Sequence, residues 1–197
     1  MAGDAVRAAV TTLPAFETAH LTVTPVTMND VDALRDVWSE PDVRRYLFDD
    51  EPVSRARADE IIRAALARVD VRLGLWVLRE RGSGAVVGAA GLQPAADVAR
   101  YAPELGGITE IVVALATGAW GKGYATEGLE PVLHYAFATR GDEQLIAVVD
   151  VPNEASHRLM VRLGFTPTGE CDGPRYRLRT YVLAKERFPA QRVDAGG

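Results

Sequence analysis

The spacing of apolar and polar positions predicts strands and helices that alternate along most of the chain. Residues that alternate between apolar and polar, or that form short β-branched runs, predict strands, whereas apolar residues three and four positions apart predict helices. The predicted strands are residues 20–26, 73–79, 85–92, 108–115 and 145–151, with further strand-like segments up to residue 188. The predicted helices are residues 31–40, 52–69, a segment from 124 to about 139, and 153–163. This order predicts an α/β fold, a mixed sheet with helices on its faces.

The ends of the chain lack this pattern. Residues 1–19 are rich in alanine with weak periodicity, and we interpret them as a weakly ordered lead-in or one marginal helix. Residues 189–197 form a predicted C-terminal tail. The segment 20–188 is then a single domain, since 197 residues suffice for one well-buried core and are few for two.

Composition and charge narrow the functional classes. Apolar residues make up 48% of the chain and charged residues 25%, which is ordinary globular usage. A formal net charge of -5 argues against binding along a nucleic-acid backbone. Cys171 is the single cysteine and only three histidines occur, so we expect neither an intrachain disulfide nor a zinc site. No secretion signal or membrane span is indicated, and we expect a cytoplasmic protein.

A strand, a glycine-rich turn and a helix start occur together between residues 108 and 127. The predicted strand is almost wholly apolar and is interrupted by Glu110; the turn contains Gly118, Gly121 and Gly123. Glycines let backbone N–H groups approach a ligand closely, and a helix start carries partial positive charge, so we interpret this unit as a pyrophosphate cradle. A plain tight turn is the competing structural interpretation, and the two glycines by themselves do not decide between them. A Walker loop and a Rossmann fingerprint both need other glycine spacings.

Two motifs in this order resemble the GNAT superfamily of N-acetyltransferases. Trp120-Gly121-Lys122-Gly123-Tyr124-Ala125 is similar to the family's pyrophosphate motif, with Trp120 in place of Gln or Arg. The stretch from Asn153 through Ser156 to Leu163-Gly164-Phe165 resembles the Asn-x-x-Ser helix of the RimJ/RimL-like branch. The resemblance implies a central, mostly antiparallel mixed sheet with splayed central strands, and acetyl-CoA as cosubstrate bound between residues 108–115 and 145–151.

The resemblance also implies roles for individual residues. Backbone N–H groups of Val113, Ala114 and Leu115 would face the pantetheine and the thioester oxygen, and residues 120–125 would hold the pyrophosphate. Ser156 would donate a hydrogen bond to the departing thiolate, and Asn153 would fix the cofactor or a water. Both are also good helix-capping residues, which is the competing structural interpretation.

Glu110 is our candidate general base. Partial burial of a lone acid in an apolar strand raises the pKa of its carboxyl toward neutrality. The competing interpretation is an ordinary salt-bridged acid at the start of a strand. The cost of deprotonating the acceptor at pH 7 is about 1.4 kcal/mol for an α-amino group and about 4.6 kcal/mol for a lysine amine. A protein N-terminus or a weakly basic small amine therefore costs less free energy to deprotonate, and a weaker general base suffices.

Departures from the family pattern leave rival functions open. Many members have a catalytic Tyr seven residues after the Asn, where this chain has Met160; Gly128 and Pro131 fall within the expected cofactor helix, and Thr117 replaces a common Pro. A non-catalytic acyl-CoA-binding sensor is the first rival, and a nucleotide-binding protein the second. We predict direct transfer without an acetyl-cysteine, to a protein N-terminus or a small-molecule amine, with no nucleic-acid or membrane partner and with homodimerisation as a family-based expectation.

Overall fold

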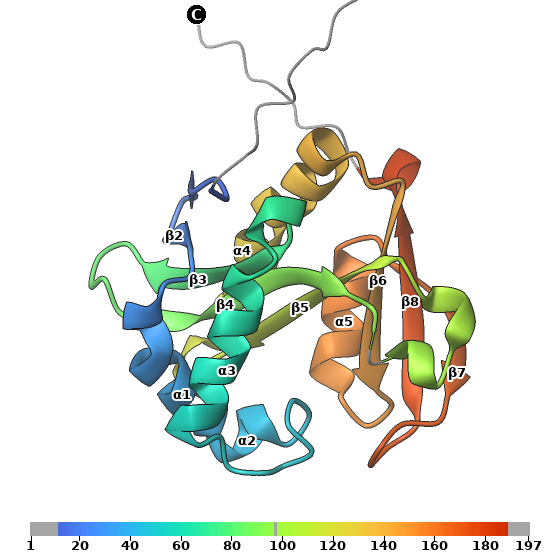
Figure 1. The fold of residues 1–197 in the computed structure, drawn as a ribbon, viewed down its shortest axis with the longest axis horizontal. Coiled ribbons are helices and arrows are strands. Elements are labelled where there is room, and N and C mark those ends of the chain that lie inside the picture. The colour runs from blue at the N-terminus through green and yellow to red at the C-terminus, as the bar shows by residue number, and fades with distance from the viewer. Residues whose placement is uncertain (1–11, 97, 189–197) are drawn as a thin grey trace, which may run out of the picture.

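The computed structural model describes residues 12–96 and 98–188 and contains one eight-stranded sheet (Figure 1). The strand order across the sheet is β1-β2-β3-β4-β5-β6-β8-β7. All neighbours are antiparallel except β5 and β6, which are parallel. The predicted mixed, mostly antiparallel α/β sheet is therefore confirmed. The strands are β1 Phe16–Glu17, β2 Leu21–Pro25, β3 Gly74–Glu80, β4 Val86–Pro94, β5 Thr109–Leu115, β6 Gln144–Asp150, β7 Thr166–Cys171 and β8 Leu178–Ala184.

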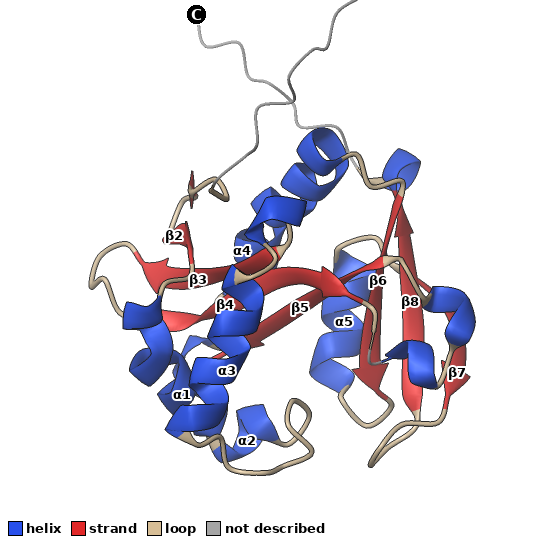
Figure 2. Cartoon of the chain, in the orientation of Figure 1, coloured by secondary structure: helices blue, strands red, loops and turns tan. Residues whose placement is uncertain are grey.

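Helices cover both faces of this sheet (Figure 2). One side carries α1, α2 and α3, and the other carries α4, which continues as a π-helix at Tyr135–Arg140, and α5. The α-helices are α1 Val31–Ser39, α2 Pro41–Arg44, α3 Arg55–Leu66, α4 Tyr124–His134 and α5 Glu154–Arg162. Pro41 follows the end of α1 and begins α2, because the first position of a helix needs no N–H partner.

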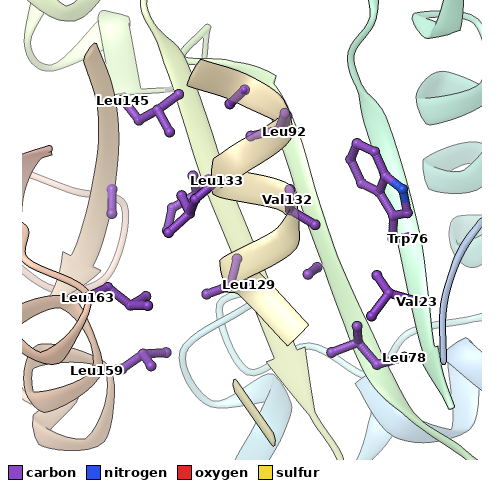
Figure 3. Close-up of a cluster of buried hydrophobic side chains, with 14 of the residues drawn as sticks. Val23, Trp76, Leu78, Leu92, Leu129, Val132, Leu133, Leu145, Leu159 and Leu163 are labelled. Carbon is purple, nitrogen blue, oxygen red and sulfur yellow. The ribbon is translucent and has the colours of Figure 1, made fainter. Parts of the chain in front are cut away.

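Apolar side chains form a large core on each face, and a smaller third cluster contains Ala95, Ala102, Leu105 and Ile146. The larger core joins α4 and α5 to the sheet: Leu129, Val132 and Leu133 of α4 lie between Trp76 on one side and Leu159 of α5 on the other (Figure 3). The second core packs α1 and α3 against β3, β4 and β5 on the face opposite α4 and α5. The helices on the two faces fix the positions of β5 and β6, which form the parallel pair of the sheet.

The segment before residue 20 differs in part from the prediction. Phe16 pairs with Val23 in β1, Leu13 is buried, and the indole Nε1 of Trp76 donates a hydrogen bond to the carbonyl oxygen of Pro14 at 2.8 Å. The described end of the predicted lead-in is thus part of the sheet, because it covers one face of a large buried aromatic side chain. The rest of the lead-in, residues 1–11, and the predicted tail, 189–197, lie outside the described residues.

Candidate active site

Strands β5 and β6 separate soon after they begin. They pair at Thr109 with Leu145 and at Glu110 with Ile146, whereas β5 pairs with β4 from Thr109 through Leu115. The arrows of β5 and β6 diverge in Figure 1. The divergence leaves the far half of β5 without a strand partner on its β6 edge. We call the space between the diverging halves the wedge.

The register determines which backbone N–H groups face the wedge. Along an antiparallel strand, successive N–H groups point to opposite edges. The N–H of Ala116 donates to the carbonyl oxygen of Val87 on β4 at 2.9 Å, so that of Ala114 also faces β4, paired with Ala89. The N–H groups of Val113 and Leu115 point to the wedge. Of the three predicted backbone donors, the register thus assigns two to the wedge and turns Ala114 away.

The glycine turn follows β5 and leads into α4. Gly121 and Gly123 have φ angles of +76° and +84°, a left-handed conformation that glycine adopts without steric cost. An added Cβ at either glycine would meet no protein atom within 4 Å, so the space beside the backbone is open. Gly123 is the N-cap of α4 and supplies no side-chain cap, which leaves the first-turn N–H groups of the helix for an anion.

Side chains around the turn hold it against the strands. The indole Nε1 of Trp120 donates to the carbonyl oxygen of Leu115 at 2.9 Å, while the ring is 49% exposed. The N–H of Thr117 donates to the carboxylate of Glu40 at 2.8 Å, a bond that the proline common at this position could not make. The departures Trp120 and Thr117 are therefore both used to position the turn.

Two acids that sequence reasoning missed anchor the start of α4. Glu80 accepts a hydrogen bond from the Tyr124 hydroxyl at 2.9 Å and lies 3.9 Å from Lys122 Nζ; hydrogen bonds from Ser83 and Tyr124 lower the pKa of Glu80. The buried ring of Tyr124 thus anchors the turn to the larger core, and the neighbouring Ala125 packs against the same core. Glu127 accepts hydrogen bonds from Thr18 Oγ1 and from the backbone N–H of His20 at 2.5 and 2.6 Å.

Asn153 and Ser156 begin α5, at the end of the loop that follows β6. The side-chain oxygen of Asn153 accepts a hydrogen bond from the N–H of Ser156 at 3.2 Å, which makes Asn153 the N-cap of α5. The capping interpretation of Asn153 is therefore confirmed, and a contact between Asn153 and the cosubstrate stays a prediction. The Ser156 side chain is half-buried, and its hydroxyl makes no hydrogen bond within the described part of the chain.

Glu110 lies at the closed end of the wedge. It is opposite Gln93 on β4 and Ile146 on β6, and its carboxylate accepts a hydrogen bond from Gln93 Nε2 at 3.1 Å. The side chain is half-buried. The side chain of Glu110 lies on the sheet face that packs against α1 and α3. The side chains of Val113 and Leu115 lie on the opposite face, which packs against α4.

The structure also fixes the surroundings of three further side chains. Met160, in the position of the family's Tyr, is buried in the larger core. His157 is buried between the Tyr181 hydroxyl and the Val151 carbonyl, at 2.8 and 3.0 Å, which is a packing role. Cys171 lies at the end of β7, and β8 and β6 separate it from the wedge.

The turn and the wedge fit acetyl-CoA. The open glycine backbone and the uncapped helix start suit a pyrophosphate, Lys122 supplies a half-exposed cation nearby, and the wedge suits an extended pantetheine that needs backbone partners. When bound, this cosubstrate supplies an acetyl thioester. Among the described residues, no group of three or more His, Cys, Asp or Glu side chains is placed to hold a metal ion. No helix in the described ranges is long and apolar enough to cross a membrane.

Comparison with known proteins agrees with this geometry. The family model described as acetyltransferase (GNAT) domain matches residues 20–166. The uncharacterized N-acetyltransferase YoaA of Bacillus subtilis (strain 168) is 28% identical over 181 residues, covering 88% of this chain and 98% of YoaA. The uncharacterized N-acetyltransferase p20 of Bacillus licheniformis is 27% identical over 175 residues, covering 87% and 89%.

Solved structures share the fold. A GNAT-family acetyltransferase from Bordetella pertussis superposes with a TM-score of 0.76 at 22% identity, covering 87% of this chain and 99% of that one. An acetyltransferase of the GNAT family from Bacillus anthracis gives a TM-score of 0.71 at 17% identity, covering 88% and 99%. The chain belongs to the GNAT acetyltransferases, and it is an N-acetyltransferase that uses acetyl-CoA. The non-catalytic sensor is not favoured by these relationships.

Proposed function

We propose that this enzyme transfers the acetyl group directly from acetyl-CoA to a primary amine, on a protein N-terminus or a small molecule. The observation that carries the proposal is the wedge: β5 and β6 share only their first residues, and the N–H groups of Val113 and Leu115 face the opening beside the glycine turn. Backbone donors aimed at the thioester oxygen stabilise the negative charge that develops there during attack.

The residues around the wedge take the other roles that the reaction needs. Residues 120–125 bind the pyrophosphate, Asn153 orders the start of α5, and the Ser156 hydroxyl donates a hydrogen bond to the departing sulfur. A carboxylate takes the proton of the amine. The sequence by itself suggests Glu110 for this step, and Glu110 lies at the closed end of the wedge, where β5 and β6 are still paired. The signature from Asn153 to Phe165 supports assignment to the RimJ/RimL-like branch.

Direct transfer is supported by the position of Cys171. Burial raises the pKa of its thiol, which disfavours the nucleophilic thiolate, and two strands separate it from the wedge. Initial-velocity kinetics with both substrates varied test the proposal. We expect intersecting double-reciprocal lines and full activity in Cys171→Ser. Parallel lines together with an inactive Cys171→Ser enzyme that still binds CoA would instead establish an acetyl-cysteine route.

A further inference from the structure

Asp150 is the last residue of β6, at the point where the chain turns toward α5. Its carbonyl oxygen accepts a hydrogen bond from the N–H of Asn153 at 2.8 Å, so it is joined directly to the loop that positions Asn153 and Ser156. The family motifs that we recognised in the sequence do not include this residue. Its side chain is half-buried and accepts no hydrogen bond from any residue that the structure describes.

The register places Asp150 on the same sheet face as Glu110. Partners in a parallel pair share a face, and Glu110 pairs with Ile146. Side chains alternate along a strand, so Asp150, four residues after Ile146, lies on that face too. The alternate residues Leu145, Ala147 and Val149 pack in the core with α4 and α5, on the opposite face.

The two carboxylates lie at different depths along the wedge. Ala114 is four residues after Glu110 on β5, which corresponds to about 13 Å along the strand. The donors Val113 and Leu115 flank Ala114, so Glu110 lies about that far from them. Extension of the register from Glu110 and Ile146 brings Asp150 to the level of Ala114, on the opposite side of the wedge. Asp150 is therefore an acid at the open end of the wedge, on the strand across from the backbone donors.

Two loops approach Asp150 on this face. The segment after α2 contributes Asp49, whose negative charge acts on Asp150, and the segment between β7 and β8 contributes Arg175, whose positive charge acts in the opposite sense. Arg175 also forms an ion pair with Asp50 at 3.2 Å. On the neighbouring strand side, Arg177 is paired with Glu170 at 3.4 Å.

These loops are tied to the end of β6. The hydroxyl of Tyr46 donates to the carbonyl oxygen of Pro152 at 3.4 Å, and the rings of Tyr46 and Tyr176 lie 6.0 Å apart. The segment after α2 and the segment between β7 and β8 are thus held beside the turn that follows Asp150.

We propose that Asp150, at the open end of the wedge across from Val113 and Leu115, takes the proton from the acceptor ammonium. This assignment rests on the proposed function and names the residue for its proton-accepting step. The ammonium nitrogen gives one proton to the Asp150 carboxylate, and its lone pair forms the N–C bond to the acetyl carbon as the C–S bond breaks. A second proton leaves the nitrogen and ends on the sulfur, which gives the amide and the free thiol. Asp150 then returns its proton to solvent.

The charge environment of Asp150 suits this step. Burial first, and Asp49 second, raise the pKa of its carboxyl to about 6 from 3.8, against the effect of Arg175. A base with a pKa just below the working pH is mostly ionised and still accepts a proton readily. Glu110, by contrast, is positioned by Gln93 at the closed end of the wedge.

The test compares Asp150→Asn, Glu110→Gln and Asp49→Asn. Acetyl transfer is measured from pH 5 to 9 with whichever of spermidine, a peptide with an N-terminal serine, and an aminoglycoside is turned over fastest. We expect Asp150→Asn to lower kcat at pH 7 about 100-fold with unchanged CoA affinity, and Glu110→Gln to lower it less than fivefold. Asp49→Asn should keep kcat at its plateau and move the acid limb of the kcat profile to lower pH, because it removes a like charge. Asparagine tolerates the left-handed backbone found at Asp49, where φ is +52°.

A second readout needs no turnover. Carboxyl carbon NMR of the free enzyme, with the Asp150 resonance identified by its absence in Asp150→Asn, should give a titration near pH 6 that shifts down in Asp49→Asn. The proposal is overturned if Asp150→Asn keeps full activity, or if Asp49→Asn moves neither the kcat limb nor the NMR titration. The Asp49→Asn result decides even where Asp150→Asn fails to fold. A wild-type enzyme that turns over none of the amines contradicts the proposed function itself, a separate outcome from an active Asp150→Asn.

Discussion

The indole N–H of Trp120 donates a 2.9 Å hydrogen bond to the carbonyl oxygen of Leu115, five residues earlier in the chain. This bond ties the start of the glycine turn to the end of β5, whose Leu115 N–H faces the wedge. The glycine turn and the end of β5 are therefore held together by this bond. The Trp120 N–H is used within the protein, and in the proposed function the backbone N–H groups at Gly121, Gly123 and the α4 start hold the phosphates.

Gly123→Ala should weaken CoA binding at least tenfold. The left-handed φ of +84° costs an alanine about 1 kcal/mol, and its methyl group would enter the open space beside the helix start. Gly118→Ala is the matched control, because Gly118 lies in the same turn, has no positive φ and is equally open. Calorimetric titration with CoA distinguishes them; equal affinities for the two variants would show that Gly123 is only a turn residue.

Gly128→Ala should destabilise the fold by about 1–3 kcal/mol. A Cβ there would lie 2.8 Å from Leu78, which is fully buried, so the clash outweighs the helix-propensity gain of about 1 kcal/mol. Urea unfolding measures the change, with Glu130→Ala on the exposed side of α4 as a control expected to stay within about 0.5 kcal/mol. A stabilised Gly128→Ala would mean that α4 sits farther from β3 than described.

Asp150→Asn should stabilise the free enzyme at pH 7. The pKa of Asp150 is raised to about 6 in the folded state, so the folded protein holds this proton more tightly than the unfolded chain does. Its stabilising contribution is complete below about pH 4 and is lost as the pH rises through 6. Relative to wild type, the variant should gain about 1–2 kcal/mol at pH 7, a figure reduced for solvent screening of this half-buried group, and nothing at pH 3.5. Thermal unfolding against pH measures it; a constant difference between the two proteins would refute the raised pKa.

Ser156→Ala should lower kcat about 100-fold and leave CoA affinity unchanged, since in the proposed function the hydroxyl donates to the departing sulfur as charge develops on it. Val161→Ala, at an exposed position of the same helix, is the control for general effects on α5. Stopped-flow or steady-state release of CoA gives kcat. Equal rates for Ser156→Ala and the control would assign Ser156 to helix structure alone.

Local patterns predicted the elements and the glycine turn because their signals lie within a few residues. Apolar spacing predicted the course of β5, and the glycines at 121 and 123 predicted the turn that follows it. The supports of the site were not predictable in this way. Tyr124 and Glu80 are 44 residues apart, and His20 and Glu127 are 107 apart, so only the fold brings them together.

The same limit applies to the carboxylates. Glu110 can be singled out in the sequence because it interrupts an apolar run. Asp150 ends a strand, where a polar residue is ordinary and gives no signal. Its depth in the wedge depends on the parallel register of Glu110 with Ile146, which joins segments separated by α4. The backbone donors depend likewise on register: pairing with β4 turned Ala114 away from the wedge.

The most direct test of the account is release of free CoA from acetyl-CoA by the purified enzyme, with N-terminal peptides, polyamines, amino acids and aminoglycosides offered in turn. The account predicts release that depends on the amine, saturates with it, and yields one acetylated amine for each CoA set free. Tight CoA binding without amine-dependent release for any acceptor would contradict acetyl transfer at the wedge.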